Sequence, residues 1–331
     1  MSLRHRLGAL VYDWPRFLRY IRGDWTRIRN RNEAISVDGR GVRCDWVYAS
    51  ELHLANVYPS AGRALMRRAF AAWPLAMKSE PVSVSGTPEV SFLIGHRGLE
   101  RLPNLVAALR SIAGQEGARI EVIVVEQSSA PEVESLLPPW VRYLHTPAGA
   151  DVDYCRAATF NAGARIARGE VLIVHDNDLL VPRRYAAEVL ARVREGWAFV
   201  DAKRFLFDLG EPETRLVFSG APVPCRPATV RQNLKGGTVA IAATAYRAAG
   251  VYDESFVGWG GEDLEFWERA RARGGVYEYG WLPVIHLWHR PQPGKVRQET
   301  APAQLRYYEL RDVPAEERIA RLRSTNFPNE K

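Results

Sequence analysis

The feature that most constrains this chain is a run of four apolar residues, Val171–Val174, that ends in the polar residues His175, Asp176, Asn177 and Asp178. A short apolar run of this kind predicts a strand that is covered on both faces, as in a parallel sheet between helices. Asp176 and Asp178 then emerge at the carboxyl end of the strand, where open α/β sheets bind their ligands. Two carboxylates there suit Mg²⁺ or Mn²⁺ bound to phosphates. The alternative is a solvated turn, in which aspartates are common.

Strand and helix patterns alternate from residue 90 onward. Apolar runs predict buried strands, and apolar side chains three or four residues apart predict helices that cover them. A strand, a helix and a second strand form a βαβ unit, so we expect a mostly parallel sheet flanked by helices. The predicted strands are Val90–Ile94, Ile120–Val125, Val141–His145, Val171–Val174, Thr238–Ala242 and Val284–Leu287, and the predicted helices are Leu102–Ile112, Tyr154–Arg168 and Glu262–Arg273.

The chain divides into a main domain and smaller flanking parts. Its 331 residues and 47% apolar content allow one large core with extensions, because single domains reach about 250 residues. We expect an N-terminal extension that is irregular apart from a helix at Ala64–Trp73, which Pro74 ends. The predicted parts are the extension over residues 1–80, a linker over 81–88, the main domain over 89–296, and a helical tail over 297–331 with helices at Ala303–Leu310 and Pro314–Leu322.

Cysteine usage and the lack of targeting segments favour the cytoplasm. The three cysteines, Cys44, Cys155 and Cys225, are too few and too scattered for a disulfide framework or a zinc cluster. The sequence has no stretch of about 20 apolar residues that could span a bilayer. It also lacks the apolar centre and cleavage site of a signal peptide. We therefore expect a protein of the reducing cytoplasm.

Basic charge is concentrated at the N-terminus. The net charge of the chain is +7, and residues 1–31 hold eight arginines against Asp13 and Asp24, a net +6. Apolar and aromatic residues, such as Trp14 and Phe17, alternate with these arginines. The mixture suits an anionic membrane surface, and it also suits a helical extension that packs its apolar side chains on the main domain. Nucleic-acid binding is disfavoured because no motif for it accompanies the charge.

Two further motifs carry groups suited to chemistry. Glu262 and Asp263 follow the loop Gly258–Gly261, whose glycines let a backbone approach a ligand closely and whose Trp259 offers an aromatic face. Acidic residues that open a helix also have an ordinary role, because they stabilise the positive end of the helix dipole. The second motif is Ile285–His289, an apolar segment with histidines at positions 286 and 289.

In this order, the three motifs resemble those of nucleotide-sugar glycosyltransferases of the GT-A fold. The form is similar to family 2, with a C-terminal motif of the galactosyltransferase and chondroitin-polymerase type. The resemblance covers roughly residues 88–300 and is specific as a set. It implies a GT-A, Rossmann-like α/β fold with the N-terminal extension added. Further matching segments are Ile94–Arg97, Asp153–Arg156, Asn161–Gly163, Lys235–Thr238 and His289–Lys295.

The resemblance implies a metal site. Asp178 is the implied direct ligand, Asp176 lies nearer the ribose and the waters of the metal, and His289 completes the site from the far end of the domain. An imidazole ligand favours Mn²⁺ over Mg²⁺. His286 can join only if the chain bends after Leu287, because residues three apart on an extended strand face opposite sides. Otherwise His286 is a core histidine or supports a ligand.

The resemblance also implies an inverting mechanism. Asp263 corresponds to the general base that removes the proton of the acceptor hydroxyl, with Glu262 binding acceptor hydroxyls and Trp259 facing a sugar ring. A base opposite the leaving group implies in-line attack and inversion at the anomeric carbon. The related retaining family of polypeptide N-acetylgalactosaminyltransferases has an asparagine where Asp263 stands.

Nucleotide contacts are implied at four positions, two of which have a plainer alternative. His96 and Arg97 lie in the loop after the first strand, where relatives bind the nucleotide, although this loop departs from the usual Pro-Thr-Tyr-Asn of the wider family. Glu126 ends the second strand, where relatives often have an aspartate that faces uracil, and its alternative is a solvated carboxylate. Arg156 is a candidate phosphate or uracil contact, and otherwise a surface cation.

Groups around the donor sugar and the acceptor are implied less specifically. Gly236 and Gly237 form the turn beneath the donor sugar, although glycine pairs form turns anywhere. Lys295 follows His289 in the position of a mobile lid and is a candidate contact for the diphosphate. The acceptor pocket is expected to be shaped by loops, including Phe205–Asn233 and the N-terminal segment.

The expected function is transfer of a sugar from UDP-galactose or UDP-N-acetylgalactosamine to a saccharide or glycolipid in surface polysaccharide synthesis, with Mn²⁺ or Mg²⁺. One alternative is a nucleotide-sugar-binding protein without turnover, and another is a sugar nucleotidyltransferase. The second is disfavoured because the sequence lacks a glycine-rich nucleotidyl loop near the first strand. The expected function depends on Asp178 and His289 meeting beside Asp263.

Overall fold

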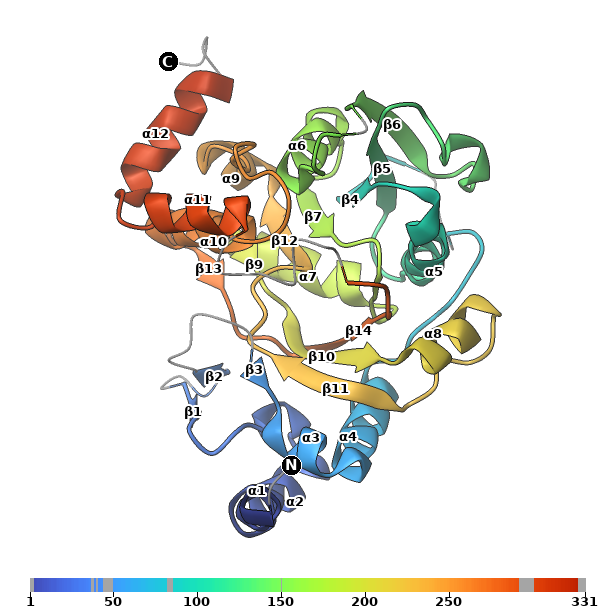
Figure 1. Cartoon of the computed structure of the whole chain (residues 1–331), viewed down its shortest axis with the longest axis vertical. Helices are drawn as coiled ribbons and strands as arrows, with labels where there is room; N and C mark the ends of the chain where they lie inside the picture. The colour runs from blue at the N-terminus through green and yellow to red at the C-terminus, as the bar shows by residue number, and fades with distance from the viewer. Residues whose placement is uncertain are drawn as a thin grey trace.

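Two β-sheets form the frame of the described part of the molecule, and helices cover their faces (Figure 1). The computed structural model describes residues 3–36, 39, 41–43, 50–81, 86–149, 151–291 and 301–326. The α/β fold expected from the sequence, with a mostly parallel main sheet between helices, is confirmed.

The main sheet has a parallel half and a half with reversed strands. From one edge to the other it consists of β13 (Val276–Tyr277), β9 (Phe199–Val200), β12 (Thr238–Ala242), β7 (Val171–His175), β4 (Val90–His96), β5 (Ile120–Ser128) and β6 (Arg142–Pro147). Strands β7, β4, β5 and β6 are parallel, whereas β12 is antiparallel to both β7 and β9. Every residue of β5 and β7 is buried, as expected for strands with helices on both faces.

Helices pack on both faces of this sheet because neighbouring residues of each strand point to opposite sides. On β4, Phe92 packs in a core with α5 (Leu102–Ala113) and α7 (Tyr185–Arg194). Its neighbour Leu93 packs in a second core with α6 (Arg156–Ile166), α9 (Ala243–Ala248) and α10 (Glu262–Arg273). Strand β12 and helix α10 have the bounds that the sequence predicted.

The second sheet was not predicted from the sequence. It consists, in order, of β3 (Ser50–Glu51), β11 (Pro227–Gln232), β10 (Lys203–Leu209), β14 (Leu282–His286) and β8 (Leu179–Leu180). The segment Phe205–Asn233, expected to be a loop, instead contains most of β10, helix α8 (Glu211–Phe218) and β11. The expected closing strand at Val284–Leu287 is β14 and belongs to this second sheet.

The N-terminal extension is a helical layer, so the prediction of an irregular segment was wrong. Phe17, Trp25 and Leu65 of this layer share a core with Phe205 and Phe207 of β10, so the layer covers one face of the second sheet (Figure 1). Its inner side therefore packs on the rest of the protein. The elements are α1 (Leu3–Gly8), a π-helical turn (Ala9–Asp13), α2 (Trp14–Ile21), a 3-10 turn (Trp25–Arg27), the strand pair β1 (Ala34–Ile35) and β2 (Val42–Arg43), α3 (His53–Val57) and α4 (Pro59–Ala72).

Buried polar contacts fix this layer to the second sheet. Nε of Arg204 on β10 donates to the carbonyl of Thr26 at 2.6 Å, and the amide of Gln232 on β11 donates to the buried carboxylate of Glu33 at 2.6 Å. At the other end of the chain, α11 (Pro302–Leu310) and α12 (Ala315–Asn326) pack against α10. The described helices include none that is both long and apolar enough to cross a bilayer.

Candidate active site

The candidate active site lies where the carboxyl ends of β7 and β14 meet. Strand β7 ends at His175, and the chain turns through Asp176 and Asp178 into β8. Strand β8 pairs antiparallel with β14, which places Leu179 opposite His286. The backbone N–H of Leu287 donates to the carbonyl of Asp178 at 2.9 Å. This pairing brings the aspartate motif and the histidine motif together from distant parts of the sequence.

Asp178, His286 and His289 form a compact cluster. One ligand atom from each side chain lies within 4.8 Å of the others. Nε2 of His289 is 3.4 Å, and Nε2 of His286 is 3.7 Å, from Oδ2 of Asp178. Strand β14 ends at His286, so the segment leaves the extended conformation in which the two rings would face apart. Oδ1 of Asp178 is buried and has no hydrogen-bond partner among the described residues. This combination of one carboxylate and two imidazoles fits Mn²⁺.

Each imidazole of the cluster is oriented through its Nδ1. Asp208 on β10 lies 3.1 Å from Nδ1 of His286, and the carbonyl oxygen of Arg290 lies 2.7 Å from Nδ1 of His289. When Nδ1 carries the proton and donates a hydrogen bond in this way, Nε2 of the neutral ring is unprotonated and can bind a metal. Burial raises the pKa of Asp208, but hydrogen bonds from His286 and Arg231 outweigh burial and hold the pKa well below its usual range.

An arginine partly neutralises the same aspartate. Nη2 of Arg101, immediately before α5, donates to Oδ2 of Asp178 at 2.6 Å and to Oδ1 of Asn177 at 3.2 Å. Burial raises the pKa of Asp178, but its electrostatic interactions with His286, Arg101 and His289 outweigh burial and lower it. Arg101 and Asp208 were not found from the sequence, because neither lies in a recognisable motif.

A second arginine joins the two acidic motifs. Arg156, at the start of α6, donates through Nε to Oδ1 of Asp176 at 2.8 Å. Its Nη1 donates to Oδ1 of Asp263 at 2.7 Å and to Oε1 of Glu262 at 3.3 Å. The guanidinium also lies over the ring of Phe160. Arg156 is therefore neither a surface cation nor, in this structure, a residue with a free guanidinium for a phosphate, because its charge is balanced by three carboxylates.

Burial changes the pKa of two of these carboxyl groups. It raises the pKa of Asp176, and the charge of Arg156 offsets that rise only in part. The pKa of Glu262 rises to about 7, because of burial first and the charge of Asp263 second. The protonated form of Glu262 is therefore favoured more than that of an ordinary glutamate.

The two oxygens of Asp263 have different surroundings. Oδ1 accepts hydrogen bonds from Arg156 and from the hydroxyl of Tyr252, the latter at 3.3 Å. Oδ2 faces Gly236, where a Cβ would lie 1.8 Å from it, so the position has room only for glycine. Gly237 has a φ of +85°, and its carbonyl accepts the N–H of Asp176 at 2.7 Å. The glycine pair thus lies between the two acidic motifs.

The glycine-rich loop before α10 turns through left-handed backbone conformations. Gly258, Gly260 and Gly261 have φ values of +88°, +103° and +87°, which glycine adopts without steric cost. The N–H of Gly258 donates to the carbonyl of Tyr154 at 2.9 Å, which fixes the loop beside the start of α6. Trp259, the predicted sugar contact, is half-buried in this loop.

The first pair of predicted nucleotide contacts is placed differently from the expectation. Strand β4 is two residues longer than predicted, so His96 is its last residue and not part of the following loop. His96 is fully buried, its Nδ1 is 3.0 Å from the amide nitrogen of Asn177, and burial lowers its pKa to about 4. Arg97 does lie after the strand, but its guanidinium donates to the backbone carbonyls of Val152 and Gly149.

The carboxylate of Glu126 is not solvated. It accepts hydrogen bonds from the backbone N–H groups of Glu132 and Val133 and from the hydroxyl of Tyr143 at 2.5 Å. Burial raises the pKa of Glu126, but these hydrogen bonds outweigh burial and lower it. Glu126 therefore holds the loop that follows β5. Lys295, predicted to reach the diphosphate, lies outside the described residues.

Comparisons with known proteins find matches to glycosyltransferases. A family model described as glycosyl transferase family 2 matches residues 99–251, and one described as the N-terminal domain of galactosyltransferase matches residues 224–279. The human protein polypeptide N-acetylgalactosaminyltransferase 12 (Homo sapiens) is 27% identical over 303 residues, or 81% of this chain and 49% of that protein. The chain therefore spans about half the length of this relative.

One solved structure matches part of this chain. The crystal structure of GalNAc-T7 with UDP, GalNAc and Mn²⁺ is similar over 75% of this chain and 53% of that chain, with a TM-score of 0.45 and 16% sequence identity. The stretch covered by the two family models, residues 99–279, contains both the aspartate motif and the pair formed by Glu262 and Asp263.

Proposed function

We propose that this chain, in which a glycosyl transferase family 2 model matches residues 99–251, transfers a sugar from a UDP-sugar to a saccharide or glycolipid acceptor, with inversion at the anomeric carbon. One observation carries this proposal. Asp178, His286 and His289 converge at the carboxyl end of β7, and Arg156 connects the same motif to Asp263.

The metal site is the first element of the proposal. Asp178, His286 and His289 would hold Mn²⁺ or Mg²⁺, and the buried unpartnered oxygen of Asp178 favours occupation by a cation. The metal, when bound, supplies positive charge that stabilises the departing diphosphate. Arg101 adds fixed positive charge beside Asp178, where a nucleotide diphosphate needs it.

The general base is the second element. Arg156 and Tyr252 occupy Oδ1 of Asp263, so Oδ2 is the oxygen that accepts the proton of the acceptor hydroxyl. Proton removal by Asp263 while the hydroxyl attacks from the side opposite the diphosphate inverts the anomeric centre. An asparagine at this position, as in the retaining family, could not accept that proton. Glu262 lies beside Asp263 and is suited to bind acceptor hydroxyls.

The donor sugar follows from the relative and from the resemblance. The human relative is named for transfer of N-acetylgalactosamine, and the glycine-rich loop with the following acidic pair resembles that of galactosyltransferases. We therefore propose UDP-N-acetylgalactosamine or UDP-galactose as donor, and synthesis of a surface polysaccharide or glycolipid as the context.

The test is release of UDP from these two donors in the presence of Mn²⁺. We expect Asp178→Ala, Asp263→Asn and metal chelation each to abolish release. The control is Glu195→Gln, which removes an exposed carboxylate paired with Arg192 on the surface. Release that survives both Asp178→Ala and chelation contradicts the proposal, as does a product with retained anomeric configuration. Donor binding without any turnover would identify the alternative, a nucleotide-sugar-binding protein.

A peripheral contact with an anionic membrane on the cytoplasmic side is a further part of the proposal. The N-terminal helices pack their inner side on the second sheet and leave an outer row of apolar side chains exposed. Arginines lie between these side chains in the sequence, and their charge suits anionic lipid. The row consists of Leu3, Leu7, Leu10, Val11 and Leu18, whose exposed fractions are 73%, 52%, 49%, 60% and 54%.

Vesicle sedimentation tests the membrane contact. The triple variant Leu7→Ser, Leu10→Ser and Leu18→Ser should no longer sediment with phosphatidylglycerol vesicles, because the apolar row is lost while the buried core is untouched. Leu305→Ser is the matched control, since Leu305 is 47% exposed but lies on α11 at the other end of the chain. Equal sedimentation of the triple variant and the control would remove the membrane contact from the proposal.

A further inference from the structure

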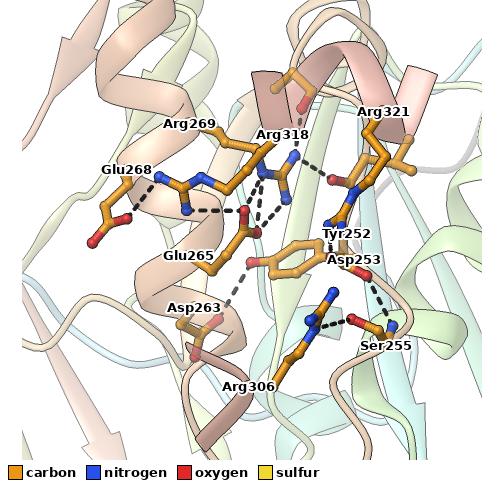
Figure 2. A network of polar contacts seen from close by, with 12 residues as sticks. Tyr252, Asp253, Ser255, Asp263, Glu265, Glu268, Arg269, Arg306, Arg318 and Arg321 are labelled. Carbon is orange, nitrogen blue, oxygen red and sulfur yellow. Dashed lines mark hydrogen bonds and ion pairs between the residues drawn. The ribbon is translucent and has the colours of Figure 1, made fainter. Parts of the chain in front are cut away.

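A buried network of charged residues joins helix α10 to the C-terminal helix α12 (Figure 2). Glu265, Arg269 and Arg318 are 1%, 0% and 3% exposed. The carboxylate of Glu265 accepts hydrogen bonds from Nε of Arg269 at 2.8 Å and from Nη1 of Arg318 at 3.2 Å. Nη2 of Arg318 also donates to Glu268 at 2.9 Å. Buried charges are costly even when paired, and apolar residues of similar size often stabilise a fold as well. Stability alone therefore does not explain why these charged residues are buried.

Arg269 reaches from this network to a strained turn. Its Nη1 donates to the carbonyl of Val251 at 2.7 Å and to the carbonyl of Ala249. Val251 has a φ of +61°, a conformation that is a genuine outlier for a β-branched residue. Such strain persists only where the surroundings enforce it, and it is concentrated at functional sites. Arg269 stabilises this conformation, because its buried guanidinium donates hydrogen bonds to two carbonyl groups of the turn.

The residue presented by the turn is Tyr252. Its backbone N–H donates to Oδ1 of Asn161 at 3.1 Å, and its ring stacks on Phe266 with centroids 4.2 Å apart and planes 12° apart. The hydroxyl is directed toward the start of α10, where it donates to Oδ1 of Asp263 at 3.3 Å (Figure 2). The position of the Tyr252 ring is thus fixed on several sides before its hydroxyl meets the carboxylate.

The C-terminal helices also hold the residues that follow Tyr252. Nη2 of Arg321 on α12 donates to Asp253 at 2.8 Å, and Nε of Arg306 on α11 donates to Ser255 at 3.1 Å (Figure 2). Both contacts, like those of Arg318, come from beyond the segment matched by the family models, which ends at residue 279. The turn is therefore held from one side by α10 and from the other by α11 and α12.

We propose that α11 and α12 act as a clamp that positions the Tyr252 hydroxyl and, through it, the carboxylate of Asp263. Arg269 and Arg318 are positioning residues in this arrangement, and Tyr252 is the residue through which they act. The inference rests on the proposed function, in which Oδ2 of Asp263 must point at the acceptor. A base has to be held within about 0.5 Å of its productive position. Hydrogen bonds to Oδ1 from Tyr252 and Arg156 meet that need.

The experiment compares Tyr252→Phe, Arg318→Met and Arg273→Met. Tyr252→Phe keeps the ring stack and removes only the hydroxyl. Arg318→Met breaks the buried link between α10 and α12 while Glu265 keeps its bonds to Arg269. Arg273→Met is the matched control, because Arg273 also joins α10 to α12, through an exposed 3.4 Å pair with Glu316.

We expect Tyr252→Phe and Arg318→Met to lower kcat for UDP release by roughly tenfold, the equivalent of one hydrogen bond. The affinity for UDP, measured by calorimetry, should not change, because the clamp acts on the base and not on the donor. Arg273→Met should match the wild type in both. Wild-type kcat in Tyr252→Phe and Arg318→Met overturns the proposal, and so does a parallel loss of UDP affinity.

A second measurement separates this inference from the proposed function. Amide hydrogen exchange over residues 249–263 should be faster in Arg318→Met than in Arg273→Met, because the turn loses one of its supports. Unchanged exchange overturns the clamp whatever the enzyme does. Faster exchange in a protein that releases no UDP supports the clamp and contradicts the proposed function alone.

Discussion

Nη1 of Arg156 donates a 2.7 Å hydrogen bond to Oδ1 of Asp263, so one partly buried guanidinium links the start of α6 to the start of α10. The same guanidinium reaches Asp176 at the end of β7. The two acidic motifs are thus held at a fixed spacing by a charge that lies between them. Without it, three carboxylates would face one another in a site with little water to screen their repulsion.

Arg156→Met should therefore be harmful to both folding and turnover. We expect a loss of about 1–3 kcal/mol in the free energy of unfolding, because the carboxylates left unpaired are only partly buried and solvent screens part of their repulsion. UDP release should fall roughly a hundredfold because the base is misplaced. Urea unfolding and a UDP-release assay measure these effects. Arg165→Met, on an exposed arginine of the same helix, should leave both near wild type, and similar effects in the two variants would contradict the prediction.

Gly236→Ala should uncouple activity from stability. The new methyl group would lie 1.8 Å from Oδ2 of Asp263 and push that carboxylate aside. We expect UDP release to fall roughly a hundredfold, as for other displacements of about 1 Å, with a loss of only about 1–3 kcal/mol in unfolding free energy. The control is Gly23→Ala, where, apart from the two chain neighbours, no atom of the described residues lies within 4 Å of the added Cβ. Full activity in Gly236→Ala would show that Asp263 tolerates displacement.

Asp208→Asn should weaken metal binding although it replaces none of the proposed metal ligands. Asp208 orients His286 through Nδ1, and removal of such an outer carboxylate typically costs 10–100-fold in affinity. Calorimetric titration with Mn²⁺ measures the change in Kd directly. Asp24→Asn, which alters an exposed carboxylate on the N-terminal layer, serves as control. An unchanged Kd would mean that His286 does not bind the metal.

Glu262→Gln should change the pH dependence of stability. The pKa of Glu262 is about 7 in the folded protein against an ordinary 4.5, so folding favours the protonated carboxyl. Its contribution to stability is fully present below about pH 4.5 and is lost as the pH rises through about 7. Relative to wild type, the glutamine variant should therefore gain stability as the pH rises from 5 to 8, as measured by urea unfolding. Parallel curves for the two proteins would refute the raised pKa.

The strands and helices with strong local signals could be predicted from the sequence. The run before Asp176 is apolar on both faces of the strand. Strand β7 could therefore be predicted as a buried strand without knowledge of its neighbours in the sheet. Helix α10 was predicted with its observed bounds, because a glycine precedes its acidic start and a glycine follows its basic end. The motif residues were found through the resemblance of the three motifs, in their order along the chain, to a known family, because each motif alone has an ordinary alternative.

The parts that depend on strand pairing could not be predicted. Strand β8 has two residues, and only its register with β14 brings His286 to Asp178. Asp208 lies on β10, in a segment that was predicted to be a loop. Turn-forming residues in this segment obscured the pattern of two strands that belong to the second sheet. Glu126 and Arg97 form hydrogen bonds with backbone groups of nearby loops. The sequence does not indicate which side chain binds which loop.

The order of elements along the chain has a consequence for biosynthesis. Arg318 follows its partner Glu265 by 53 residues, so every motif that marks the active site has been translated well before the helix that supports it. A ribosome that stops between His289 and α12 would release a polypeptide with the residues of the metal cluster and the acidic pair but with an unsupported turn at Tyr252. The motif residues are therefore all translated before the site is supported. In the proposed arrangement, the turn at Tyr252 is held only after α12 has been translated.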